Sequence, residues 1–217
     1  MILALLGLSI GAAALYVALA RSSEPADIQV AHAGAGDLAL HEHPSVGLCP
    51  WREPERDRRQ FFPTSTDVRE DTLILSGKRT EVARQLGRPA TGEENALKVY
   101  RILNQEQLLG SFVARRVRGE SGVIELLLAV GTDGRIVGAK LQRLREPEDV
   151  AHVLQSASWL GAFTGKDRTS SWQLGGDIPD VPPAAKTSAA AVLDAARTLL
   201  ILLGVADGSA APGTDRR

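Results

Sequence analysis

Apolar and polar positions in the middle of the chain follow the pattern of paired β-strands. Four runs have the length and composition of strands: 97–103, 108–117, 123–130 and 135–144. Asp133-Gly134 separates the last two, and Asp-Gly between β-rich runs is a strong hairpin signal because both residues can take positive φ. The stretch 124–130 is almost continuously apolar, which predicts a central strand. The pattern therefore predicts a small antiparallel sheet of three or four strands.

A helical segment and a capped turn precede these strands. Residues 80–86 have helical spacing, with Thr80 as the expected N-cap and Gly87 as the stop. Thr91 and Glu94 have the spacing of a capping box, in which each side chain bonds the other residue's backbone N–H. These signals predict local helical structure on the N-terminal side of the sheet.

Two helices are expected after the strands, at 146–156 and 188–203. Thr187 or Ser188 is the expected cap of the second helix, and Gly204 is its expected end. This helix is short for a membrane span and contains charged residues, so we expect it to pack in the core. The sequence therefore predicts an α+β fold, a small antiparallel sheet with flanking helices.

The N-terminus predicts a single transmembrane helix ahead of this domain. Residues 1–20 hold no charged side chain, and about 20 apolar residues are enough to cross the hydrocarbon core. Ala18-Leu19-Ala20 also has the form of a signal-peptide cleavage site, but no basic residue precedes the apolar run, so an anchor is favoured. We expect a single-pass membrane protein with its domain on the extracytoplasmic side, although Arg21 argues weakly for the opposite topology.

The stretch between anchor and domain predicts a tether at 21–60, which ends in a charged segment. Its three histidines are expected to be solvated linker residues rather than metal ligands. The charged run 51–59 alternates in sign, which predicts an exposed segment that is open to partner docking rather than a polybasic membrane patch. The folded domain is expected at 61–204, and a polar tail at 205–217.

Composition excludes several classes of protein. The formal net charge is −1, from 25 basic and 26 acidic residues, so no global basic field points to nucleic acid. The single cysteine, Cys49, excludes an internal disulfide and paired-cysteine metal sites. The sequence also lacks a P-loop and a recognisable nucleophile–base motif, so an electron-transfer or accessory role is favoured over a stand-alone enzyme.

The order of motifs resembles a known family. The chain carries Val-Gly-Thr-Asp-Gly-Arg-Ile-Val-Gly at 130–138, Trp-Leu-Gly-Ala-Phe-Thr-Gly-Lys at 159–166 and Thr-Ser-Ala-Ala-Ala-Val at 187–192. With the N-terminal anchor, this set resembles the FMN-binding domain of the G subunit of Rnf electron-transport complexes and of the C subunit of sodium-pumping NADH:quinone reductase. The resemblance covers about 97–203.

The resemblance implies a flavin site at the start of the last helix. Family members attach FMN to a Thr in a small-residue loop, where helix N–H groups can face the phosphate. The positions that match this site are Arg145, Glu146, Ala184, Ala185, Lys186, Thr187 and Ser188. Lys186 stands where the family has its acceptor Thr, and the family's two glycines after Arg145-Glu146 are missing. Noncovalent FMN is therefore expected over covalent FMN, and loss of flavin is the alternative.

The resemblance implies two alternative roles. In the first, a membrane-anchored FMN-binding domain transfers electrons as a subunit or accessory of a membrane redox complex. In the second, a cofactor-free structural or assembly subunit keeps the fold. Both imply the membrane and other subunits of the complex as partners, and neither implies nucleic acid.

Overall fold

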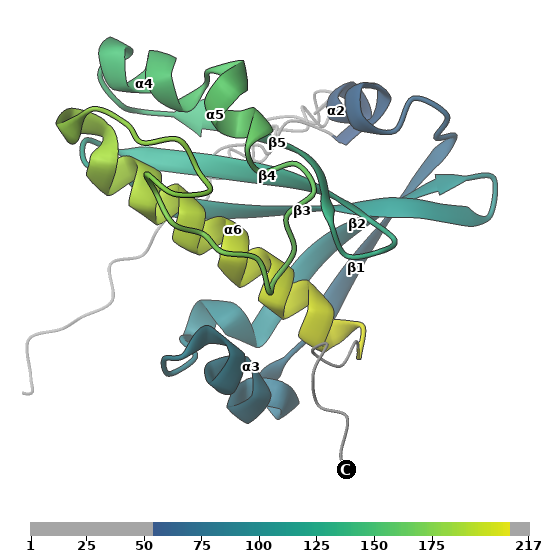
Figure 1. Ribbon diagram of the computed structural model, residues 1–217. Helices are drawn as coiled ribbons and strands as arrows, with labels where there is room; N and C mark the ends of the chain where they lie inside the picture. Colours follow the sequence, from purple (N-terminus) through teal and green to yellow (C-terminus); the bar gives the residue numbers. More distant parts are fainter. Residues whose placement is uncertain (1–53, 209–217) are drawn as a thin grey trace, which may run out of the picture. The chain divides into compact units, whose positions relative to one another are not determined.

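The fold is an antiparallel sheet of five strands with helices on both faces (Figure 1). The structure is a computed structural model that describes residues 54–208, with side chains from residue 57; the predicted anchor, most of the predicted tether and the end of the tail lie outside these residues. The strands are β1 (Asp67–Ile74), β2 (Ala96–Asn104), β3 (Gln107–Arg118), β4 (Val123–Gly131) and β5 (Ile136–Leu144). Each strand pairs with the next one along the chain, and the predicted α+β class is confirmed.

Within residues 54–208, five helices and three 3₁₀ turns accompany the sheet. The helices are α2 (Pro54–Phe61), α3 (Arg79–Leu86), α4 (Glu148–Leu154), α5 (Ala157–Gly161) and α6 (Lys186–Ala206). The turns are η1 (Ser76–Lys78), η2 (Gly92–Asn95) and η3 (Pro183–Ala185). Gly87 ends α3 in the left-handed conformation, with φ of 74°, and Thr91 and Glu94 form the predicted capping box.

The main core lies between the sheet and α6, which crosses one face of it (Figure 1). Val192 and Leu199 of α6 are buried in the same cluster as Val113 of β3 and Leu126 of β4. Within residues 54–208, one helical stretch, Pro183–Ala206, is long and apolar enough to cross a membrane, but 67% of its most apolar window is buried inside the domain. The sequence-based interpretation of α6 as a core helix is therefore confirmed.

The other face of the sheet carries α2, which the sequence placed in the tether. Asp57 and Arg58 are only 2% and 9% exposed, and the Asp57 carboxylate binds Lys140 and, at 2.7 Å, the side-chain amide of Gln142. The prediction of an exposed charged run is therefore wrong for these two residues. For Asp57 the cause is that β5 supplies polar partners, which no local sequence pattern could reveal.

Two phenylalanines at the end of α2 fit against glycines of the sheet. A Cβ at Gly138 would collide with the Phe61 ring, and one at Gly110 would lie 2.6 Å from the ring of Phe62. Both rings contact Phe112, with centroids 6.1 and 5.6 Å away. The two glycines therefore form sockets that let α2 approach the sheet closely.

Helix α6 differs from its prediction at both ends. Its N-cap is Ala185, so neither Thr187 nor Ser188 caps it, and it continues beyond Gly204 to Ala206. Gly204 lies inside the helix, where a Cβ would collide with the guanidinium of Arg168. The glycine thus marks a close approach of a neighbouring segment rather than a helix end.

Candidate functional site

The predicted flavin site corresponds to an open cleft at the start of α6. Its volume is about 330 Å³, and it is lined by Glu120, Ser121, Pro147, Asp149, Val150, Pro183, Ala184 and Thr187. These residues come from the β3–β4 turn, the start of α4, and the η3–α6 junction. The fold therefore brings together segments that are far apart in the sequence.

Two of the predicted site residues, the buried Ser188 and the half-buried Glu146, form hydrogen bonds with the β3–β4 turn. The Ser188 side chain is fully buried, and its hydroxyl accepts a hydrogen bond from the Glu120 N–H at 2.8 Å. The Glu146 carboxylate accepts from the Ser121 N–H at 3.2 Å. A Cβ at Gly119 would collide with Glu146, so this turn is packed directly onto both side chains. Ser188 and Glu146 thus hold the β3–β4 turn in place.

The remaining residues of the predicted loop face different surroundings. Ala185 is buried, whereas Ala184 and Thr187 are exposed and line the cleft. Lys186 is exposed beside the cleft, and its ammonium group lies 3.5 Å from the Asp180 carboxylate. Arg145 does not line the cleft. Of the seven predicted site residues, only Ala184 and Thr187 therefore form its wall.

The residues of the cleft do not fit the phosphate of FMN. Two carboxylates, Glu120 and Asp149, line it, and none of the described lining residues is a Lys or Arg. Carboxylates repel a phosphate at short range. The acceptor position holds Lys186, whose amine cannot form the family's phosphoester, and the Ser188 hydroxyl is already bonded to the β3–β4 turn. The N-terminus of α6 favours an anion, but the side chains around it do not.

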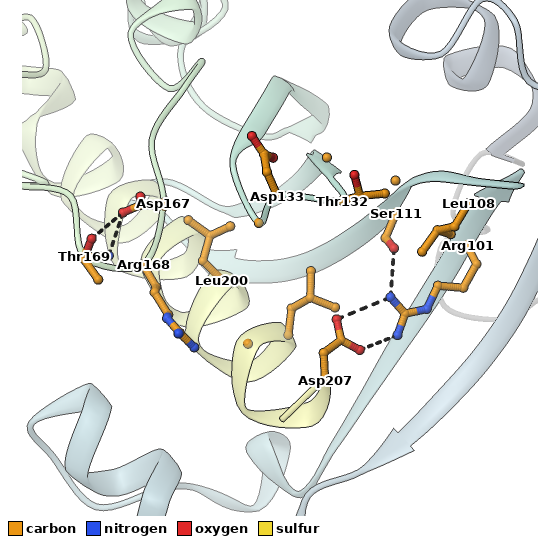
Figure 2. A pocket seen from close by; sticks show the side chains of 15 residues that line it. Arg101, Leu108, Ser111, Thr132, Asp133, Asp167, Arg168, Thr169, Leu200 and Asp207 are labelled. Atoms are coloured by element: carbon orange, nitrogen blue, oxygen red, sulfur yellow. Dashed lines mark hydrogen bonds and ion pairs between the residues drawn. The ribbon is translucent and has the colours of Figure 1, made fainter. Parts of the chain in front are cut away.

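A second cavity, of about 220 Å³, lies near the other end of α6 (Figure 2). Leu200 and Leu203 contribute apolar surface to its wall. Arg101 reaches Asp207 at 2.6 Å and the Ser111 hydroxyl at 3.1 Å, as Figure 2 shows. These contacts tie the end of α6 to β2 and β3. No local sequence pattern indicates this cavity, because its residues come from separate segments with no shared motif.

Among the carboxyl groups of the described residues, Glu94 has the most strongly shifted pKa, and it lies in neither cavity. Burial alone would raise the pKa of Glu94, but hydrogen bonds from Arg88 and from the Thr91 N–H, with the charges of Arg88 and Arg115, hold it at about 2. Arg88 lies 2.8 Å and Arg115 3.2 Å from this carboxylate. Glu94 therefore connects η2 to β3 as an ionised structural residue rather than a proton donor.

Metal binding finds no support in the described part of the chain. Residues 54–208 contain no group of three or more His, Cys, Asp or Glu side chains that could hold a metal ion. The tether histidines lie outside these residues.

Comparisons with solved structures point to a distant likeness in fold. No family model matches the chain, and no curated protein matches it. Among solved structures, NqrC of Shewanella oneidensis is similar, with 15% sequence identity and a TM-score of 0.46; the match covers 70% of this chain and 88% of that one. The likeness is a distant one in fold and assigns no activity to this chain.

Proposed function

We propose that this chain is a subunit or accessory of a membrane redox complex that keeps an FMN-binding-like scaffold without holding flavin. The observation that carries the proposal is the internal use of two site residues. Ser188 and Glu146 accept hydrogen bonds from the consecutive N–H groups of Glu120 and Ser121. The side chains that would face a cofactor instead bind the β3–β4 turn. We therefore propose that the site stabilises the fold rather than holding a cofactor.

The proposed setting rests on sequence features. The order of motifs from 130 to 192 supports kinship with flavin-carrying subunits of membrane complexes. The uncharged run at 1–20 supports a single-pass anchor, and we propose that the domain lies on the extracytoplasmic side. The partners would be the membrane and the other subunits of the complex.

A second candidate function is electron transfer with bound FMN. The observation that favours it is Thr187, whose exposed side chain lines the cleft one residue beyond the family's acceptor position. Lys186, whose side chain is 52% exposed, lies beside it. In this alternative, Thr187 would face the FMN phosphate and Lys186 would offset its charge, while the bound flavin would supply the redox chemistry.

A visible spectrum and an intact mass of the full chain, purified from its native host, distinguish the two candidates. The proposal expects colourless protein with the mass of the sequence. A mass surplus equal to FMN less the water released by phosphoester formation would show covalent attachment, and its loss in Thr187→Val would place it at Thr187. Yellow colour that is released on denaturation would show noncovalent flavin. Either flavin signal would overturn the cofactor-free proposal.

A further inference from the structure

Four arginines gather on the sheet face opposite α6, at the end of the sheet next to the β3–β4 turn. They are Arg116, Arg118, Arg143 and Arg145, and we refer to them as the arginine patch. Strand register defines the face, because side chains alternate between the two faces of a sheet. Leu127 and Phe112 belong to the cluster on the α2 side, so residues an even number of positions away on the same regular strand share that side.

The first row of the patch crosses three strands. Arg116 of β3 pairs in register with Glu125 of β4, and Glu125 pairs with Arg143 of β5. The Arg116 guanidinium lies 3.1 Å from the Glu125 carboxylate, whose side chain is 5% exposed. The single acid of this row is thus buried and paired, which leaves the row with an excess of positive charge at the surface.

The second row lies one pleat further along the same strands. Arg118 pairs with Val123, and the Arg145 N–H donates to the Val123 carbonyl at 3.1 Å, which extends the ladder beyond β5. Val123 is 40% exposed. An apolar side chain therefore lies open between two exposed arginines.

Three of these arginines have no charge partner within the described part of the chain. Arg118, Arg143 and Arg145 form no ion pair with any residue of 54–208, whereas Arg101, Arg115 and Arg135 each do. The β3 and β5 arginines are separated by about 10 Å, twice the spacing of neighbouring strands. A ligand with several anionic groups therefore matches arginines spaced in this way better than a single carboxylate does.

We propose that the arginine patch binds an acidic segment of a partner protein. Every cation in it is Arg, whose planar fork binds carboxylates with two hydrogen bonds, and Arg beside exposed apolar surface is typical of protein interfaces. A membrane surface attracts Lys and Arg alike as point charges, which gives no reason for arginine alone. The inference rests on the proposed role as a subunit and specifies the chemistry of its partner.

The test is binding of a fluorescein-labelled oligoglutamate peptide to the full chain in a nonionic detergent, followed by fluorescence anisotropy. We expect the triple variant Arg118→Gln, Arg143→Gln, Arg145→Gln to weaken binding about tenfold at low salt, since each exposed pair contributes a fraction of a kcal/mol. The corresponding Arg→Lys triple is expected to weaken binding as well, because Lys lacks the fork. Arg116 is left intact because it pairs with buried Glu125.

A matched control removes the same charge elsewhere. Arg59, Arg69 and Arg84 are exposed, and their combined change to Gln is expected to leave peptide binding unchanged. Equal loss in both triples would mean that net charge alone attracts the peptide, and the proposal would fall. It would also fall if the wild-type chain did not bind the peptide. If the triple variant does not fold, Arg145→Gln alone provides a milder variant, because Arg145 lies just after β5 rather than within a strand.

Mixed micelles that contain phosphatidylglycerol or phosphatidylcholine test the competing target. If the patch triple weakened capture of anionic lipid but left peptide binding unchanged, the patch would be a membrane surface and the proposal would be overturned. The outcome is separate from the flavin question, because peptide binding is measured whether the protein is yellow or colourless.

Discussion

The hydroxyl of Ser188 accepts a hydrogen bond from the backbone N–H of Glu120, and this 2.8 Å contact joins the first turn of α6 to the β3–β4 turn. A buried donor that loses its acceptor costs more than the net value of the bond itself. The contact therefore makes the predicted cofactor site a point of structural stability.

Ser188→Ala is expected to lower the free energy of unfolding by about 1–2 kcal/mol, because it leaves the Glu120 N–H without this acceptor. Urea denaturation followed by circular dichroism measures the change. Thr187→Ala is the matched control, since Thr187 is exposed and neighbours Ser188. Equal effects of the two substitutions would show that the Ser188 contact is not stabilising.

Glu94 is expected to make stability dependent on acid pH. Its pKa is about 2 in the folded protein against an ordinary value of 4.5. A depressed carboxyl pKa stabilises the fold above the unfolded value, and this contribution is lost as pH falls from about 4.5 towards 2. Glu94→Gln should cost about 2–3 kcal/mol at pH 7 and much less near pH 2.

Unfolding in urea at pH 7 and near pH 2.5 tests this expectation. The control is Glu93→Gln, because the neighbouring Glu93 side chain is 80% exposed and should change little at either pH. A cost of Glu94→Gln that stayed constant across pH would contradict the assignment of an ionised, arginine-bound carboxylate.

Gly138→Ala is expected to destabilise the domain by about 1–3 kcal/mol, because its Cβ would strike the ring of Phe61. In a Phe61→Ala background the same change should cost less, and a double-mutant cycle of unfolding free energies measures the difference. Gly161→Ala is the control, since no atom lies within 4 Å of its added Cβ. If the two substitutions changed the unfolding free energy additively, the proposed close packing of Phe61 against Gly138 would be refuted.

Asp57→Ala is expected to release α2 from the sheet, because it leaves Lys140 and Gln142 without the buried carboxylate. Removing one partner of a fully buried pair costs about 3 kcal/mol, and because the Lys140 side chain is 35% exposed we expect about 1–2 kcal/mol here. Trypsin should then cleave at Arg58 and Arg59 faster than in the wild type. The exposed Asp67 offers the control Asp67→Ala, and equal cleavage rates in all three proteins would rule out the proposed attachment.

Local signals in the sequence predicted the hairpins and the capping box. Gly134 takes a positive φ of 77° in the β4–β5 turn as expected, but Asp133 does not, so one of the two anticipated positive values is found. The turn closes with a bond from the Gly131 N–H to the Arg135 carbonyl. The residue types predicted a turn at the right place, while its exact geometry depended on the pairing of the two strands.

The sequence did not predict strand β1 or helix α2, and the reason is the same for both. Asp67–Ile74 is rich in charged residues because β1 is an edge strand and most of its side chains are exposed. Charge is usual on such edges. The buried Asp57 of α2 is paired with Lys140 of β5, which lies more than eighty residues away in the chain. Both elements depend on tertiary partners, which no local pattern reports.

The candidate site shows the same limit. The order of motifs located the start of α6 and the β5–α4 connection as one site, and the cleft contains residues from both. Ser188 and Glu146 accept hydrogen bonds from the β3–β4 turn, which lies about seventy residues before Ser188 in the chain. Residue types alone could not show whether these groups face a ligand or a backbone N–H.

The sequential pairing of all five strands bears on how the polypeptide matures on the ribosome. Each strand can pair with the preceding strand as soon as it leaves the ribosome, because every strand pairs with the one synthesised just before it. The apolar surface facing Val192 and Leu199 gains its cover only after α6 has been translated. An mRNA truncated before codon 186 would thus yield a sheet with one apolar face exposed to solvent. Such a species would be prone to aggregation and would be bound by chaperones.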